Sequence, residues 1–480
     1  MNTSRRYFRP IWILAGGLGI VALLGSAATA SAVTSGGTWG RAKQVAAALN
    51  QGDARLNSVS CASAGNCSAG GSYTDGPHHV QAFVVNRTHR GWRAAEEVPG
   101  TAALNAGGFA EVESVSCASA RTCSAGGAYT DSSGHSQAFV VNRTHGSWRT
   151  AEEVPGTAAL NAGGFASTQS VSCASAGTCS AGGYYTDGAG NRQAFVVSET
   201  GGVWGTAEEV PGTAALNQGG GAEITSLSCA AAGTCSAGGA YTDSSGHSQA
   251  FVVDETGGVW GTAEEVPGTA ALNQGGFAQL KSVSCGSAGT CSAGGSYSDS
   301  FGHDQAFVVN RTHGIWSTAE PVHGPAIFSR HRSAVIFSVS CASAGSCSAG
   351  GSYSDSSLHV QAFVVDKTGG VWRTAREVPG TAALNQGGAA QVDSVSCGSA
   401  GTCSAGGSYT DSSGHGQAFV VNRTHGTWRT AEEVPGIAVL NTGIFAGIFS
   451  LSCAPVASCS AGGAYSVPSG HTRAFVVNKG

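Results

Sequence analysis

Apolar and polar residues alternate along this chain in short runs that are separated by turn residues. In residues 112–156, VESVSCAS alternates apolar with small polar residues, and CSAGGAYT follows after a five-residue hairpin loop. QAFVVN, rich in β-branched and aromatic residues, lies between the turn sequences DSSGH and RTHG, and WRTAEEV runs up to Pro155. The pattern predicts four short strands, and it shows no helical spacing over a window of helical length.

The pattern is an internal repeat with a period of 56 residues. The positions that keep this period include the first cysteine of each C-x5-C pair, at Cys61, Cys117, Cys173, Cys229, Cys285, Cys341, Cys397 and Cys453. A four-stranded unit of this length cannot bury both faces of its sheet alone, whereas a ring of such sheets can. We therefore predict an all-β fold, an eight-bladed β-propeller of 56-residue four-stranded blades. An open β-solenoid with terminal caps is the alternative.

The two ends of the chain favour the closed ring. The last repeat stops after its third predicted strand, at AFVVNKG, and lacks the Trp strand. Residues 34–52 resemble residues 256–275, so Trp39 is the eighth copy of the Trp position. The N-terminal strand is then expected to pair with the C-terminal blade and close the ring, because a solenoid has no use for a divided repeat.

The first 32 residues have the pattern of a signal peptide. A basic segment, MNTSRRYFRP, precedes an apolar run and the small residues Ala30 and Ala32. The run from Ser4 to Arg9 resembles the twin-arginine export motif, and both twin-arginine and general export stay open. We expect residues 33–480 to form a single propeller domain, secreted and extracellular, with no membrane span because no other apolar run reaches about 20 residues.

Export to an oxidising compartment predicts that the cysteines form disulfides. Two cysteines that flank a five-residue turn between antiparallel strands come within bonding distance, so pairing is expected inside each blade. Zinc sites prefer shorter spacings, and no metal or cofactor is expected. The predicted pairs are Cys61-Cys67, Cys117-Cys123, Cys173-Cys179, Cys229-Cys235, Cys285-Cys291, Cys341-Cys347, Cys397-Cys403 and Cys453-Cys459.

Charge excludes one class of partner. Only 11% of residues are charged and the formal net charge is −5, so the chain lacks the basic surface that a phosphate backbone requires. Nucleic acid is not an expected partner, and we expect a monomer.

The repeat carries two family resemblances. The turns DETGGVW (254–260), SETGGVW (198–204) and DKTGGVW (366–372) resemble the Asp-box hairpin of sialidase-like β-propellers. The whole unit with its C-x5-C resembles a repeat of secreted actinobacterial proteins of unassigned function, and the near identity of the blades is similar in organisation to tachylectin-type sugar-binding propellers. These resemblances imply fold and export. They do not imply sialidase catalysis, because that reaction would need an arginine cluster and a unique Tyr-Glu pair, and neither is recognisable in this sequence.

The best repeated polar group lies in the turn between the second and third strands. It offers an aromatic ring, a carboxylate, an imidazole and an amide, which are groups that sugar hydroxyls use, and the connector asparagines Asn161, Asn217, Asn273 and Asn385 are expected on the same face. Ordinary turn chemistry is the alternative for the Asp, and a Ca²⁺ site there would need more oxygen ligands. The predicted ligand-binding residues are Tyr129, Asp131, His135, Gln137, Tyr241, Asp243, His247, Gln249, Tyr409, Asp411, His415 and Gln417.

One segment, PVHGPAIFSRHRSAVIF at residues 321–337, departs from the repeat. If a unique site exists, its expected residues are His323, Arg330, His331 and Arg332. The function that we favour from the sequence is a secreted, non-catalytic binding or scaffold propeller for glycan or cell-wall polymer. A hydrolase-like propeller enzyme with its site near residues 321–337, and a purely structural surface protein, are the alternatives.

Overall fold

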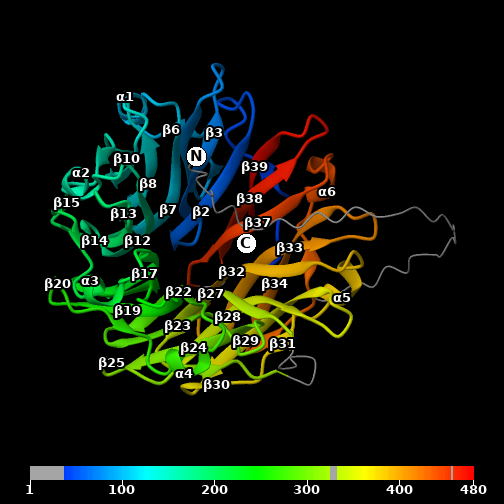
Figure 1. The fold of residues 1–480 in the computed structure, drawn as a ribbon. Coiled ribbons are helices and arrows are strands. Elements are labelled where there is room, and N and C mark those ends of the chain that lie inside the picture. The colour runs from blue at the N-terminus through cyan, green and yellow to red at the C-terminus, as the bar shows by residue number, and fades with distance from the viewer. Residues whose placement is uncertain (1–36, 325–331, 456–457) are drawn as a thin grey trace, which may run out of the picture. The chain divides into compact units, whose positions relative to one another are not determined.

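The computed structural model describes residues 37–324, 332–455 and 458–480, and these form a propeller of eight four-stranded blades, as predicted (Figure 1). The blades follow one another in chain order, from blue to red in Figure 1. In each blade the strands are antiparallel, and in seven blades they lie in sequence order from the axis outward; in the eighth, the outermost strand comes from the N-terminal residues 43–44. None of the helices in the described residues is long and apolar enough to cross a membrane. The expected signal peptide, residues 1–32, lies outside the described residues and stays a prediction.

The three long strands of each blade have bounds that recur with the 56-residue period. The innermost strands are β2 (Ala54–Ser63), β7 (Ala110–Ser119), β12 (Ala166–Ser175), β17 (Glu223–Ala231), β22 (Ala278–Ser287), β27 (Ala334–Ser343), β32 (Ala390–Ser399) and β37 (Ala446–Cys453). The second strands are β3 (Asn66–Thr74), β8 (Thr122–Thr130), β13 (Thr178–Thr186), β18 (Thr234–Thr242), β23 (Thr290–Ser298), β28 (Ser346–Ser354), β33 (Thr402–Thr410) and β38 (Cys459–Ser466). The third strands are β4 (Val80–Thr88), β9 (Ser136–Thr144), β14 (Arg192–Thr200), β19 (Ser248–Thr256), β24 (Asp304–Thr312), β29 (Val360–Thr368), β34 (Gly416–Thr424) and β39 (Thr472–Lys479).

The fourth strand is broken into two short pieces, where the sequence predicted one continuous strand. In the second blade, Ala151 lies between the pieces, and its N–H donates to the carbonyl of Pro99 in the preceding connector (2.7 Å), so the chain leaves the sheet there. The first pieces are β5 (Gly91–Trp92), β10 (Ser147–Trp148), β15 (Val203–Trp204), β20 (Val259–Trp260), β25 (Ile315–Trp316), β30 (Val371–Trp372) and β35 (Thr427–Trp428). The second pieces are β6 (Glu96–Glu97), β11 (Glu152–Glu153), β16 (Glu208–Glu209), β21 (Glu264–Glu265), β26 (Glu320–Pro321), β31 (Arg376–Glu377) and β36 (Glu432–Glu433).

The connectors between blades contain single helical turns. Each begins after a glycine of positive φ, such as Gly100 (φ 92°), and the hydroxyl of Thr101 donates to the carbonyl of Val98 (2.7 Å). Four residues are too few to produce a helical pattern in the sequence. The helices are α1 (Thr101–Leu104), α2 (Thr157–Leu160), α3 (Thr213–Leu216), α4 (Thr269–Leu272), α5 (Thr381–Leu384) and α6 (Ile437–Leu440).

The ring closes as the sequence predicted. Strand β1 (Lys43–Gln44) pairs with β39 and completes the sheet β1-β39-β38-β37. Trp39 forms an isolated bridge with Lys479, and its indole N–H donates to the Oδ1 of Asn422 (3.1 Å) in the seventh blade. The first and last innermost strands, β2 and β37, lie side by side (Figure 1).

Serine hydroxyls occupy the inner edges of the innermost strands. The N–H of Val115 donates to the hydroxyl of Ser58, and the N–H of Cys117 donates to that of Ser60, both at 2.9 Å and both from the second blade to the first. The equivalent bonds occur at all eight junctions, including Val59 to Ser450 at the closure. Since these edges have no further strand to pair with, the repeated Ser-x-Ser-Cys supplies the missing acceptors.

The apolar core lies between consecutive blades. One cluster joins Val84 and Val98 of the first blade to Val112, Phe139 and Trp148 of the second, and similar clusters recur around the ring. The bulky Phe and Trp residues of the outer strands therefore fill the space between neighbouring blades.

All sixteen cysteines form the eight predicted disulfides, within blades and with Cα–Cα distances of 3.9–4.0 Å. Each joins the innermost strand to the second strand at directly opposed positions, such as Cys173 and Cys179. Disulfides at this density are typical of an oxidising compartment.

Candidate ligand-binding site

The Asp of the turn between the second and third strands is used within the turn. Oδ1 of Asp131 accepts hydrogen bonds from the N–H groups of Ser133 (2.8 Å) and His135 (3.0 Å), and Oδ2 accepts one from Nε2 of Gln137 (3.0 Å). Burial by itself would raise the pKa of Asp131, but these hydrogen bonds outweigh it and lower the pKa. Asp243 and Asp411 have the same partners in their blades.

The Gln of the turn joins it to the connector. Oε1 of Gln137 accepts a hydrogen bond from Nδ2 of Asn161 (2.9 Å), and Oδ1 of Asn161 accepts one from the N–H of Phe165 (2.7 Å). Gln249 and Gln417 are bonded in the same way to Asn273 and Asn441. The connector asparagines lie at the same end of the propeller as the turn, as predicted, but their amide groups serve this internal link.

The tyrosines of the predicted site are buried, so they do not offer the exposed aromatic ring that we expected. Tyr129 is 3% exposed and its hydroxyl donates to Oε2 of Glu153 (3.3 Å). Tyr241 and Tyr409 are also buried and donate to the equivalent glutamates. Burial, followed by the nearby carboxylate, raises the pKa of Tyr129 well above its usual range. The phenol therefore stays protonated and serves packing.

The imidazole is the accessible group of the turn. The side chain of His135 is 57% exposed, and its Nδ1 lies 3.9 Å from Oδ2 of Asp131. A Cβ on Gly164 of the connector would lie 2.7 Å from the His135 ring, and Gly164 has φ +79°, so this position requires glycine. His247 is exposed in the same setting, and His415 is half-buried.

In three blades an exposed phenylalanine of the connector forms a backbone bridge with the residue after the histidine, and the sequence interpretation missed it. Phe165 is 46% exposed and bridges to Ser136, the residue after His135. Phe109 and Phe277 hold the same place beside His79 and His247, with exposures of 36% and 40%. The sequence does contain a signal for it: a phenylalanine directly follows the LN-x-GG turn, in a surface loop where a large apolar residue is not required for packing. We call the three pairs His–Phe units: His79 with Phe109, His135 with Phe165, and His247 with Phe277.

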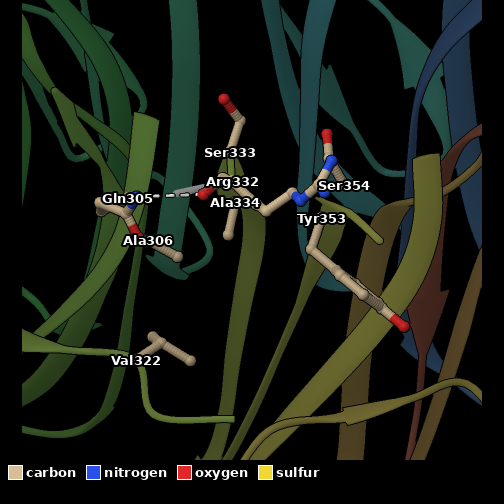
Figure 2. A pocket seen from close by; sticks show the side chains of 8 residues that line it. All are labelled: Gln305, Ala306, Val322, Arg332, Ser333, Ala334, Tyr353 and Ser354. Atoms are coloured by element: carbon tan, nitrogen blue, oxygen red, sulfur yellow. Dashed lines mark hydrogen bonds between the residues drawn. The ribbon is translucent and has the colours of Figure 1, made fainter. Parts of the chain in front are cut away.

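The divergent segment holds a small cavity at its described end. Nε2 of Gln305 donates to the carbonyl of Arg332 (3.0 Å), as Figure 2 shows, and Nη2 of Arg332 donates to the carbonyl of Ser356 (3.0 Å). The cavity measures about 20 Å³, room for one water molecule. It is lined by Gln305, Ala306, Val322, Arg332, Ser333, Ala334, Tyr353 and Ser354 (Figure 2).

Of the other residues expected in that segment, the structure describes only His323, which does not line this cavity. His323 is exposed, and its carbonyl accepts a hydrogen bond from the N–H of Ala375 (2.7 Å). Arg330 and His331 lie outside the described residues. A unique site near residues 321–337 stays a prediction.

The third blade contains a cluster with no counterpart in the other repeats. Tyr184 stands where the other blades have Ser or Ala, and its ring stacks on Phe165 with centroids 5.7 Å apart. The guanidinium of Arg192 lies 4.2 Å from the Tyr184 ring centroid and pairs with Glu223 (2.8 Å). Burial raises the pKa of Tyr184 to about 12. A protonated phenol and a closed ion pair suit packing and binding better than proton transfer.

No protein-family model matches this chain, and no curated protein matches it. Among solved structures it is similar to the BP39L lectin of Burkholderia pseudomallei, at 12% identity and a TM-score of 0.44 over 80% of this chain and all of that one. A protein of unknown function from Dyadobacter fermentans matches at 14% identity and a TM-score of 0.37, over 63% of this chain and 92% of its own. A subtype N11 neuraminidase-like protein of A/flat-faced bat/Peru/033/2010 (H18N11) matches at 10% identity and a TM-score of 0.33, over 65% of this chain and 86% of its own. Similarity at this level is limited to the arrangement of strands.

Proposed function

We propose that this chain is a secreted, non-catalytic binding propeller whose His–Phe units contact a glycan or cell-wall polysaccharide at several blades. The observation that supports the proposal is that an imidazole and a phenyl ring are both exposed at three blade ends, where the phenylalanine backbone forms a bridge with the residue after the histidine. The other polar groups of the turn have internal partners, as in the second blade, where Asp131, Gln137 and Tyr129 are all hydrogen-bonded. The imidazole and the phenyl ring are therefore the ring groups that stay exposed at these blade ends.

The two side chains suit a sugar in different ways. The negative face of a phenyl ring attracts the partly positive C–H groups on the apolar face of a pyranose. A neutral imidazole offers one N–H donor and one acceptor nitrogen to the hydroxyls around that ring. One unit of two side chains is expected to bind weakly, near millimolar, which is about 4 kcal/mol.

Copy number raises the affinity for a polymer. Once one unit has bound a polymer chain, the other two units on the ring bind the same polymer intramolecularly. This raises the overall avidity by roughly 10²–10⁴ without any increase in the affinity of a single unit. The eight disulfides support a secreted location, since the oxidising compartments in which disulfides persist are extracellular or on the export route.

The test is co-sedimentation with insoluble polymers, chitin and peptidoglycan. Replacing Phe109, Phe165 and Phe277 together by Ala should reduce binding by at least about a hundredfold, while a single replacement should reduce it by about tenfold or less. The matched control replaces Val203, Val259 and Ile315 by Ala, which are 70–73% exposed at the start of the outer strands. Polymer binding that survives the triple Phe replacement, or that is lost equally in the control, would show that the units are not the binding site.

A further inference from the structure

The three His–Phe units differ in one neighbouring position of the following blade. Beside the second unit this position holds Tyr184, which is the only large residue there in the whole repeat, since the other copies are Ser or Ala. The equivalent residues for the first and third units are Ala128 and Ser296. Only the second unit, His135 with Phe165, is therefore extended by another aromatic ring.

Tyr184 supports the phenylalanine of the second unit. The two rings are nearly parallel, at 8°, with centroids 5.7 Å apart. The backbone of Phe165 is held as well, because its N–H donates to Oδ1 of Asn161 (2.7 Å) and its carbonyl accepts from the N–H of Thr186 (2.8 Å). An exposed ring whose orientation is already set loses little freedom when a ligand binds. The second unit is therefore expected to bind more tightly than the other two.

A guanidinium is fixed beside the Tyr184 ring. The carbon at the centre of the Arg192 guanidinium lies 4.2 Å from the ring centroid, and Nη1 of Arg192 donates to Oε2 of Glu223 in the fourth blade (2.8 Å). The side chains of this ion pair are 38% and 25% exposed. The pair therefore holds the guanidinium at the surface, where a ligand on the second unit can reach it.

Tyr184 and Arg192 keep hydrogen-bond donors free for a ligand. Within the described part of the chain, the Tyr184 hydroxyl has no hydrogen-bond partner, whereas the hydroxyl of the adjacent Tyr185 donates to Glu209 (3.0 Å). Nε and Nη2 of Arg192 also make no hydrogen bond to the described residues. Burial raises the pKa of Tyr184 to about 12, so the phenol keeps its proton. A guanidinium cannot accept a hydrogen bond, so this group needs an acceptor from its ligand.

The surrounding charges favour a neutral acceptor over an anionic one. After burial and Arg192, the groups that act on the pKa of this phenol are the carboxylates of Glu223, Glu113 and Glu111, and all three raise it. Each guanidinium here already has a carboxylate partner, since Arg192 pairs with Glu223 and Arg55 pairs with Glu111. Neither cation is left to balance the carboxylate of an acidic sugar, which the glutamates would repel.

We propose that the second His–Phe unit is the strongest of the three and that Tyr184 and Arg192 make it selective for N-acetylated sugars. The acetamido group carries a neutral carbonyl, which accepts from the phenol or the guanidinium, and a methyl group, which packs on the exposed ring of Phe165. Chitin and peptidoglycan carry this group, and cellulose does not. The inference rests on the proposed function, because it names the class of sugar that the same surface takes.

Ligand-observed NMR titration of the oxidised chain tests the selectivity with two soluble probes. Chito-oligosaccharide and cello-oligosaccharide of equal length share the same linkage and differ in the acetamido group, and we expect the former to bind at least about tenfold more tightly. Tyr184→Phe keeps the stacked ring and removes only the hydroxyl. It should reduce this preference by roughly two- to tenfold, the value of one hydrogen bond, and leave cello-oligosaccharide binding unchanged. Tyr184→Ala should weaken the binding of both probes, because Phe165 loses its support.

The third unit provides the matched control. Phe277 is 40% exposed, close to the 46% of Phe165, but its unit lacks the tyrosine. Phe165→Ala should therefore weaken chito-oligosaccharide binding by at least about tenfold and Phe277→Ala by less than about twofold. Tyr184→Ala and Arg192→Ser install the residues that the fourth blade carries at these positions, so both variants should fold, and Arg192→Ser should lower the preference for the N-acetylated probe.

Three results would overturn the inference: equal binding of the two probes, an unchanged preference in Tyr184→Phe, or equal effects of Phe165→Ala and Phe277→Ala. Each of them leaves the proposed function standing as long as co-sedimentation with chitin and peptidoglycan still depends on the three phenylalanines together. Loss of that dependence would refute the proposed function and this inference with it.

Discussion

Replacing Trp39 by Ala should open the ring, whereas the same replacement at Trp148 should not. Both indoles are buried, with exposures of 5% and 7%, and both donate to an asparagine of the preceding blade. They differ in chain connection. Residues 39–45 are joined to the described blades at one end only, whereas the segment around Trp148 continues into a blade on both sides.

The structure gives the size of the difference. Loss of a buried Trp side chain costs about 3–5 kcal/mol at either position. Without its anchor, the N-terminal segment also loses the backbone hydrogen bonds from Gly40 to Asn478, from Ala42 to Pro435 and from Val45 to Ala474, at 2.8–2.9 Å. At about 0.5–1.5 kcal/mol each, these add roughly 3 kcal/mol to the cost of Trp39→Ala. The freed edge of β39 then favours association with other chains.

Thermal unfolding and light scattering on the oxidised protein measure both effects. Trp148→Ala should lower the unfolding midpoint and remain monomeric, while Trp39→Ala should lower it further and form oligomers that grow with concentration. Equal midpoints and equal monomer content in the two variants would refute the view that β1 closes the ring.

Two further changes test other parts of the structure. Ser58→Ala should lower the free energy of unfolding by about 1–3 kcal/mol, because the N–H of Val115 loses its acceptor, and denaturant titration against the exposed Ser132→Ala would show whether the serine ring matters. The hydrogen bond from Gln193 holds the pKa of Asp187 below its usual value. The stability that this carboxylate contributes is therefore present above the usual pKa, about 4, and is lost as the pH falls through the lowered pKa. Asp187→Asn should reduce this loss of stability in acid, and unfolding measured below pH about 4 that is unchanged by the replacement would contradict the reasoning.

The sequence predicted the fold in detail because the same strand pattern, turn residues and cysteine pair occur in eight successive repeats. The 56-residue period, the strand patterns and the C-x5-C hairpins follow from residues within one blade, and Trp39 identifies the strand that completes the last one. The break at Ala151 did not show in the pattern, because a hydrogen bond to Pro99 of another blade produces it. The helical turns were missed because four residues carry no periodicity.

The sequence predicted correctly that the blade-end turn and the connector lie at the same end of the propeller, and it named the wrong aromatic ring as exposed; that this end binds a ligand stays a prediction. The turn and the connector meet, as His135 and Gly164 show. The aromatic ring that the turn presents is Phe165 of the next connector, and Tyr129 is covered. Both residues are aromatic and both lie near a strand end, so the local pattern does not distinguish them.

The sequence by itself determined the blade, because strand alternation, turn residues and a six-residue cysteine separation are local. Only the tertiary structure decided which side chains remain for function, because some polar groups of each blade find their partners in the neighbouring blade, about 55 to 62 residues away. Ser58 with Val115, Asn86 with Trp148 and Asn142 with Glu199 are such pairs. Two nearly identical repeats therefore differ in chemistry at their junctions: Asn142 stands where the next repeat has Ser198, and Oε2 of the buried Glu199 has no hydrogen-bond partner among the described residues.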